Sequence, residues 1–214
     1  PLPEDVLAGK VLFHSSARPE MARDGWISCA SCHLDGGHDG RTWVLVDGPR
    51  NTTPIRGLGS TFPFHWSGDR VDVFDFQKTV RDVQFGTGLS EEENALLAAF
   101  LGHGEVPASP YPVDAAAKRG EQVFAESGCA TCHADGAFTD GLTHDVGTGG
   151  AVGEQRGPEF DTPTLLGLYD TAPYLHDGRA PTLRSVFAGG DGPHAVSEGV
   201  VDDLVSYLRT LPQD

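Results

Sequence analysis

The sequence is poor in cysteine, methionine and basic residues. Its 214 residues include four cysteines, one methionine and 15 lysines and arginines, against 31 aspartates and glutamates. The formal net charge of −16 makes nucleic acid and anionic membrane surfaces poor partners, because both repel an acidic chain. No apolar run approaches the length of a helix that spans a bilayer. The acidity could steer a basic partner to the chain, or it could only keep the chain soluble.

All four cysteines fall in two copies of one pentapeptide. The copies are Cys29-Ala30-Ser31-Cys32-His33 and Cys129-Ala130-Thr131-Cys132-His133. A C-x-x-C-H segment is the attachment signature of c-type haem, in which both thiols add to vinyl groups and the histidine binds the iron. A redox disulfide does not require the histidine, and the cysteine pairs of a zinc site usually lie closer together in sequence. We therefore expect two covalently bound haems c.

The expected haem attachment also bears on location and partners. Haem is normally attached to C-x-x-C-H outside the cytoplasm, and the sequence begins with Pro1 rather than methionine. We therefore expect a mature or excised piece of a periplasmic or extracellular protein. Its partner would be a redox protein, for which a basic one is a candidate, or other domains of a longer protein. We expect no nucleic acid partner and no membrane span.

The two halves of the sequence repeat each other. Four blocks recur in the same order: 7–13 matches 118–124, 51–58 matches 161–168, 62–70 matches 172–179, and 89–101 matches 196–208. The last block is typical of a helix in both halves, with Ser90 and Ser197 as N-caps. The repeat predicts a mostly α fold of two tandem cytochrome c-like domains with long Gly/Pro-rich loops. We place these domains at residues 1–107 and 108–214, joined by a proline-rich linker.

These blocks resemble the bacterial diheme cytochrome c peroxidases and their MauG-type relatives over most of the chain. Besides the haem motifs, the resemblance rests on Gly48-Pro49-Arg50-Asn51-Thr52 and on Thr171-Ala172-Pro173-Tyr174-Leu175-His176-Asp177-Gly178. The segment His65-Trp66-Ser67-Gly68-Asp69-Arg70 also resembles compact diheme domains of larger extracytoplasmic proteins. The resemblance implies that His33 and His133 are the proximal iron ligands.

The resemblance implies two further features. One is a calcium ion bound by the side-chain oxygen of Asn51 and by the backbone carbonyls of Thr171 and Pro173. Oxygen ligands suit this hard cation, although Asn51 taken alone is typical of a turn. The other is a tryptophan between the haems, which matches Trp66. This residue is a candidate electron relay or a packing residue between the domains.

The distal side of the second haem departs from the family pattern. The position at which the peroxidases place methionine, and the MauG-type enzymes tyrosine, is Gly190 here. The only methionine, Met21, precedes the first haem motif. The nearest coordinating side chain is His194, for which a solvent-exposed loop position is the alternative. We predict ligation by His133 and His194, which gives a lower potential than a His/Met pair.

The first haem departs from the family at its catalytic position. The peroxidases place there a glutamate that moves protons above an open iron, whereas this chain has Gln84, which cannot exchange a proton as a carboxylate does. Another family glutamine in that pocket corresponds to Gln77. The first iron is then open or weakly ligated, or it is bound by His65 or, less favourably, by His38. His65 matches His176, which is not an axial ligand in the family.

Two functions compete at this point. Electron transfer between two haems requires only the features already described. The alternative is an enzyme that reduces peroxide or oxidises a partner at an open first haem, with Gln77, Gln84 and Trp66 as candidate catalytic residues. A gas-sensing or haem-carrying role is a third possibility.

The acids that could replace the missing glutamate are Asp82 and Glu91 to Glu93. Three further histidines have no motif around them and are expected at the surface or in loops: His14, His103 and His144.

Overall fold

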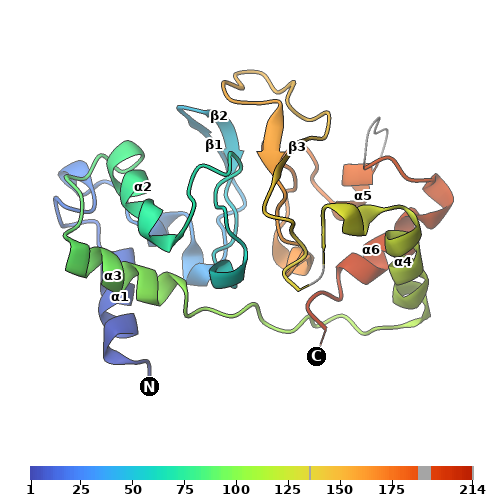
Figure 1. The fold of residues 1–214 in the computed structure, drawn as a ribbon, viewed down its shortest axis with the longest axis horizontal. Coiled ribbons are helices and arrows are strands. Elements are labelled where there is room, and N and C mark those ends of the chain that lie inside the picture. Colours follow the sequence, from blue (N-terminus) through green and yellow to red (C-terminus); the bar gives the residue numbers. More distant parts are fainter. Residues whose placement is uncertain (135, 188–193, 214) are drawn as a thin grey trace. The chain divides into compact units, whose positions relative to one another are not determined.

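The computed structural model describes residues 1–134, 136–187 and 194–213, and its fold combines helices with short strands (Figure 1). The helices are α1 (Glu4–His14), α2 (Phe76–Asp82), α3 (Glu91–Leu101), α4 (Ala115–Glu126), α5 (Leu183–Phe187) and α6 (Val201–Leu208). The strands form two antiparallel hairpins, β1 (Thr42–Leu45) with β2 (Gly48–Asn51) and β3 (Thr143–Asp145) with β4 (Glu159–Asp161).

The predicted mostly α fold is corrected to a mixed fold in which helix predominates. With the short 3₁₀ turns and the isolated β-bridges included, 38% of the described residues are helical and 10% are in strands. The difference arises in the segments that were expected to be loops, because each of them contains one of the two hairpins. The hairpins pair over only three or four residues, which is too short for a clear alternating pattern in the sequence.

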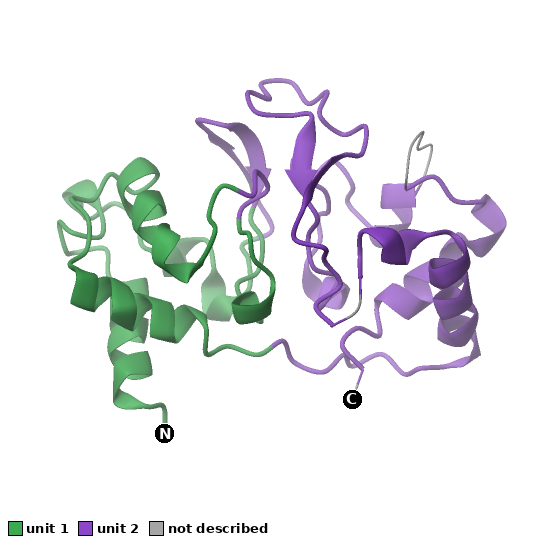
Figure 2. Ribbon diagram, viewed as in Figure 1, with its two compact units in different colours: residues 1–39, 52–64, 69–105 green, residues 40–51, 65–68, 106–214 purple. Residues whose placement is uncertain are grey.

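The chain divides into two compact units that are not continuous in sequence (Figure 2). The first unit consists of residues 1–39, 52–64 and 69–105, and the second of residues 40–51, 65–68 and 106–214. The β1–β2 hairpin therefore belongs to the second unit, although it follows the first haem motif in sequence. The division at residue 107 stays a prediction about domains that fold independently.

In the first unit, α1 packs against α3. Gly9 lies at their contact, where an added Cβ atom would overlap the carbonyl oxygen of Leu96. The N-terminus of α3 has the predicted cap: the Ser90 hydroxyl accepts the Glu93 N–H at 3.2 Å, and the Glu93 carboxylate accepts the Ser90 N–H at 3.0 Å. The buried core around these helices comprises Leu12, Phe13, Met21, Ile55, Leu58, Phe64, Val80, Leu89, Leu97 and Leu101.

The second unit repeats this helix contact with α4 and α6. Gly120 takes the place of Gly9, and a Cβ atom there would overlap the carbonyl oxygen of Asp203. Ser197 stands at the predicted N-cap position, but its side chain makes no capping hydrogen bond. The buried core of this unit comprises Phe124, Leu165, Leu183, Leu204, Tyr207, Leu208 and Leu211.

The backbone corrects the alignment of one repeat block. The Phe64 N–H donates to the Arg70 carbonyl at 2.8 Å, as the Tyr174 N–H does to the Ala180 carbonyl at 2.8 Å. His65, with φ 66°, is thereby equivalent to Leu175, with φ 69°. Trp66, not His65, is therefore the counterpart of His176. The match of His65 with His176 was wrong because identical histidines aligned one position out of register.

We expect Gly120→Ala to destabilise the second unit. Alanine normally stabilises a helix interior relative to glycine, but here its methyl group would force α4 and α6 apart, which costs about 1–3 kcal/mol. Chemical denaturation followed by circular dichroism measures the effect. Gly199→Ala is the control, since a Cβ atom there meets no neighbour within 4 Å. Equal stability of the Gly120→Ala variant and the parent protein would contradict the close helix contact.

Candidate haem sites and the polar network of the second unit

Both haem motifs form the same tight turn. Short 3₁₀ turns span Cys29–Ser31 and Cys129–Thr131. The His33 N–H donates to the Cys29 carbonyl at 3.0 Å, and the His133 N–H donates to the Cys129 carbonyl at 2.9 Å. Each turn brings two thiols and one imidazole together, which is the arrangement that haem attachment requires. One cysteine pair lies in each unit, and all four thiols are free.

The four thiols lie in environments that suit an apolar group. Burial raises the pKa of Cys29 to about 11. Burial also raises the pKa of Cys32, Cys129 and Cys132. These thiols are therefore held protonated and away from water, unlike the activated thiolate of a redox disulfide. This environment fits the edge of a porphyrin, and the residues present fit covalent haem.

The His133 side chain is oriented for metal binding. Its Nδ1 donates a hydrogen bond to the Phe138 carbonyl at 3.1 Å. Burial lowers the pKa of His133, so that the ring is neutral. A neutral imidazole whose Nδ1 hydrogen is held by a carbonyl keeps its Nε2 lone pair for a metal. His133 is therefore suited to be an iron ligand.

A second imidazole acts on His133. His194 is half-buried, and burial lowers its pKa. The charge that a protonated His194 would carry also lowers the pKa of His133, so the two imidazoles lie within electrostatic range of each other. The pairing of His133 and His194 on one iron stays a prediction. Gly190, at which the family places its own ligand, lies outside the described residues.

Both glutamines predicted near the first haem make contacts within the first unit. Gln84 is buried, and its Nε2 lies 3.7 Å from the Cys29 sulfur. The Gln77 Oε1 accepts the Leu89 N–H at 2.8 Å. Gln84 is therefore beside the haem attachment, whereas the Gln77 oxygen is used by the backbone. His38 and His65, the alternative ligands, are both half-buried.

The acids that could replace the missing glutamate have structural roles or are exposed. Asp82 lies 3.4 Å from the Arg70 guanidinium. Glu93 forms an ion pair with Arg18 and caps α3. The other two candidates, Glu91 and Glu92, are exposed in the first turn of α3.

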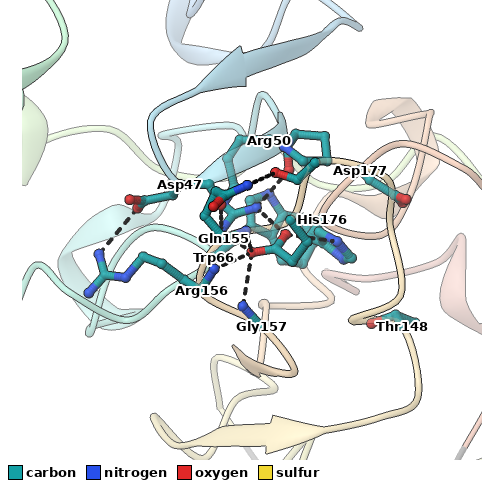
Figure 3. A network of polar contacts seen from close by, with 12 residues as sticks. Asp47, Arg50, Trp66, Thr148, Gln155, Arg156, Gly157, His176 and Asp177 are labelled. Atoms are coloured by element: carbon teal, nitrogen blue, oxygen red, sulfur yellow. Dashed lines mark hydrogen bonds and ion pairs between the residues drawn. The ribbon is translucent and has the colours of Figure 1, made fainter.

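A buried ion pair joins the β1–β2 hairpin to a distant loop of the second unit (Figure 3). Arg50 donates to both carboxylate oxygens of Glu154, at 2.6 and 3.0 Å. Glu154 also accepts the N–H groups of Arg156 at 2.8 Å and Gly157 at 2.9 Å. These hydrogen bonds, the one from Arg50 above all, lower the pKa of Glu154 to about 2. Sequence reasoning missed Glu154, because its partner is 104 positions away.

His176 lies against this ion pair. It is 1% exposed and stacks on Phe160, with ring centroids 3.9 Å apart. Its Nε2 is 3.5 Å from a Glu154 carboxylate oxygen. The Trp66 ring meets the His176 ring edge-on, with centroids 6.4 Å apart. Burial lowers the pKa of His176, so that this centre holds a neutral imidazole beside a charged pair.

The structure also brings together two of the three residues expected to bind calcium. The Asn51 Nδ2 lies 2.5 Å from the Pro173 carbonyl oxygen. Thr171, two residues before Pro173, is buried. The Trp66 indole N–H donates to the Asn51 carbonyl at 2.9 Å. Asn51 is thus fixed between the Trp66 segment and the Pro173 segment, both within the second unit.

We expect Glu154→Gln to lower the free energy of unfolding near neutral pH and to make it depend less on pH in acid. A carboxylate with a depressed pKa stabilises the fold fully above its ordinary pKa of 4.5, and this stabilisation is lost as the pH falls towards 2. The variant should lose on the order of 3 kcal/mol above pH 4.5 and show a weaker pH dependence below it. Chemical denaturation between pH 2 and 6 measures both effects. Glu159→Gln, which removes an exposed carboxylate, is the control. The same pH dependence of the free energy of unfolding in the parent protein and both variants would refute the low pKa of Glu154.

The sequence has relatives among characterised proteins, although no family model matches it. It is 31% identical to the methylamine utilization protein MauG of Methylorubrum extorquens, over 98% of this chain and 78% of MauG. Identity to hydrazine synthase subunit gamma of Kuenenia stuttgartiensis is 28%, over 97% of this chain and 78% of that subunit. Identity to cytochrome c peroxidase Ccp of Escherichia coli is 26%, over 98% of this chain and 59% of that protein.

Solved structures have the same fold. A chain of Kuenenia stuttgartiensis hydrazine synthase superposes with a TM-score of 0.84 at 26% identity, over 99% of this chain and 88% of that one. The diheme peroxidase BthA of Burkholderia thailandensis superposes with a TM-score of 0.71 at 14% identity, over 99% and 86%. Together with the two haem-attachment turns, these relatives show that the chain belongs to the MauG-like diheme cytochrome c peroxidase family and is a diheme c-type cytochrome built for electron transfer.

Proposed function

We propose that the two haem sites of this electron-transfer protein have different roles. The second iron is held between His133 and His194 and serves as a low-spin relay. The first iron is held by His33 and is open or weakly ligated on its other side. The observation that supports this division most directly is the geometry at each motif: the Phe138 carbonyl holds the His133 Nδ1 and leaves its Nε2 for iron, whereas Gln84 lies beside Cys29 at the first motif.

The chain supplies the tethers, the ligands and the exclusion of water. When bound, haem supplies one-electron redox chemistry. The Phe138 carbonyl fixes the His133 ring, and burial keeps both imidazoles of the second site neutral. Two imidazoles give a lower potential than an imidazole and a thioether. Trp66, which lies against His176, is the candidate electron-relay residue.

Peroxide reduction is the alternative, and the side chains near the first site favour electron transfer over it. O–O cleavage needs a group that exchanges protons close to an open iron. The residue beside the first attachment is Gln84, whose amide cannot do so. Asp82 and Glu93 are engaged by Arg70 and Arg18. The first iron would then bind small ligands without turning peroxide over rapidly.

The calcium site is also part of this proposal. The Asn51 Oδ1 is buried and, within the described residues, has no hydrogen-bond partner. Buried polar atoms are normally paired, and an ion is one way to satisfy such an atom. The Asn51 amide meets the Pro173 carbonyl through its nitrogen, so rotation of the amide would turn its oxygen towards an ion bound by that carbonyl, and the Thr171 carbonyl is the third proposed ligand. Calcium favours such neutral oxygen donors completed by water.

Partners and location follow from charge and from haem attachment. The net charge of −16 suits a basic redox protein as electron donor or acceptor, and further domains of a longer protein could serve the same purpose. In the described part of the chain, no helix is both long and apolar enough to cross a bilayer. A periplasmic or extracellular location fits covalent haem attachment.

We expect slow peroxide reduction in the parent protein and faster reduction in Gln84→Glu. The variant places a carboxylate beside the first haem attachment, and such an acid–base group contributes on the order of 100-fold or more. Peroxide-dependent oxidation of a reduced dye measures the rate. Gln77→Glu is the control, because the Gln77 oxygen is held by the Leu89 N–H. Rapid turnover by the parent protein would favour the enzyme instead.

We expect His194→Ala to convert one low-spin haem to high-spin. Loss of the distal imidazole leaves the second iron with a single strong protein ligand, His133. Electron paramagnetic resonance of the oxidised protein counts the two spin states. His103→Ala removes an exposed histidine and should leave the spectrum unchanged. A spectrum of His194→Ala identical to that of the parent protein would exclude the ligand role.

A further inference from the structure

The two repeats place Asn51 and Asp161 in equivalent positions. Trp66 and His176 are counterparts, as the backbone register shows. The Asn51 N–H donates to the His176 carbonyl at 2.5 Å, and the Asp161 N–H donates to the Trp66 carbonyl at 2.9 Å. Each of these strand residues is thus anchored to the counterpart segment of the other repeat. Both contacts lie within the second unit.

Asp161 shares a second property with Asn51. It is 9% exposed, and its Oδ1 is buried without a hydrogen-bond partner among the described residues. An unpaired buried polar atom calls for a missing partner, and a carboxylate without one is the more costly case. The charge that acts on Asp161 is the negative charge of Asp140, which together with burial raises the pKa of Asp161 to about 8. A bound cation would supply the partner that the Asp161 Oδ1 lacks and would offset the charge of Asp140.

We propose that Asp161 is the anionic ligand of a second hard divalent cation, of the calcium class, in addition to the ion proposed at Asn51. The inference rests on the proposed calcium site only for the choice of cation. Oxygen donors select such a cation, and Asp161 adds the charge that Asn51 does not have. Asp140 lies close by, so its charge strengthens the attraction, and water completes the coordination.

The neighbours of Asp140 include a cysteine of the second haem motif. The ligand atoms of Cys132, Asp140 and His144 lie within 4.8 Å of one another. Cys132 is used by haem attachment, and the His144 Nε2 lies 2.7 Å from an Asp140 oxygen. His144, which was expected at the surface or in a loop, is half-buried in strand β3. The charge of Asp140 acts both on Asp161 and on Cys132, so a cation at Asp161 would lie within electrostatic range of the second haem attachment. Its positive charge should favour the reduced state of that haem.

The test counts calcium ions on the holoprotein. Chelated protein is titrated with Ca²⁺ by calorimetry, and bound calcium is measured per pair of haems. We expect two ions on the parent protein, one on Asp161→Ala, one on Asn51→Ala, and two on Asp145→Ala, which removes an exposed acid of the same hairpin. In Asp161→Asn, which keeps the side-chain volume, the affinity of one site should fall about tenfold or more.

The second readout is the potential of the second haem, which should rise on addition of Ca²⁺ in the parent protein and not in Asp161→Asn. One ion that is lost in Asn51→Ala but kept in Asp161→Asn would overturn the second site and leave the proposed calcium site intact. One ion that is lost only in the Asp161 variants would support the second site and overturn the first. No bound calcium would overturn both.

Discussion

Covalent attachment of a haem to each C-x-x-C-H turn is the constraint on which the rest of the structure depends. Haem attachment needs two thiols and an imidazole held close together in one orientation, and each unit provides one such turn. Their buried cores are small, with seven residues in the second. A bound porphyrin would supply the apolar volume that such cores lack. In each unit the ends of the long loops are held by the haem-attachment turn and by the helices, which contact each other closely at Gly9 and at Gly120.

The repeat explains how two similar halves come to do different things. The helix contact, the haem turn and the strand that follows it recur with the same geometry, but the residues that meet the ligands differ. His194 acts on the pKa of His133 at the second haem motif, whereas the first motif has Gln84 beside it. In the same way Trp66 replaces His176, and Asn51 replaces Asp161. These exchanges of side chains on a duplicated scaffold are the basis on which we propose one closed and one open haem site, and one neutral and one charged cation ligand.

Local signals in the sequence predicted what depends on neighbouring residues. The haem motifs, the Ser90 cap and the helix in the last block of each repeat were all predicted from the sequence. The strands were missed because each hairpin is short and held by contacts to distant segments. Glu154 was missed because only the folded chain brings it to Arg50. The pairing of His65 with His176 failed because residue identity was compared without the turn geometry that fixes the register.

Intact-mass spectrometry of the protein, under conditions that strip non-covalent ligands, tests the central claim most directly. The polypeptide has a mass of 22.7 kDa. We expect one species that exceeds this mass by two haem groups. A species at the bare polypeptide mass would contradict the covalent attachment on which the fold, the ligands and the electron-transfer function depend.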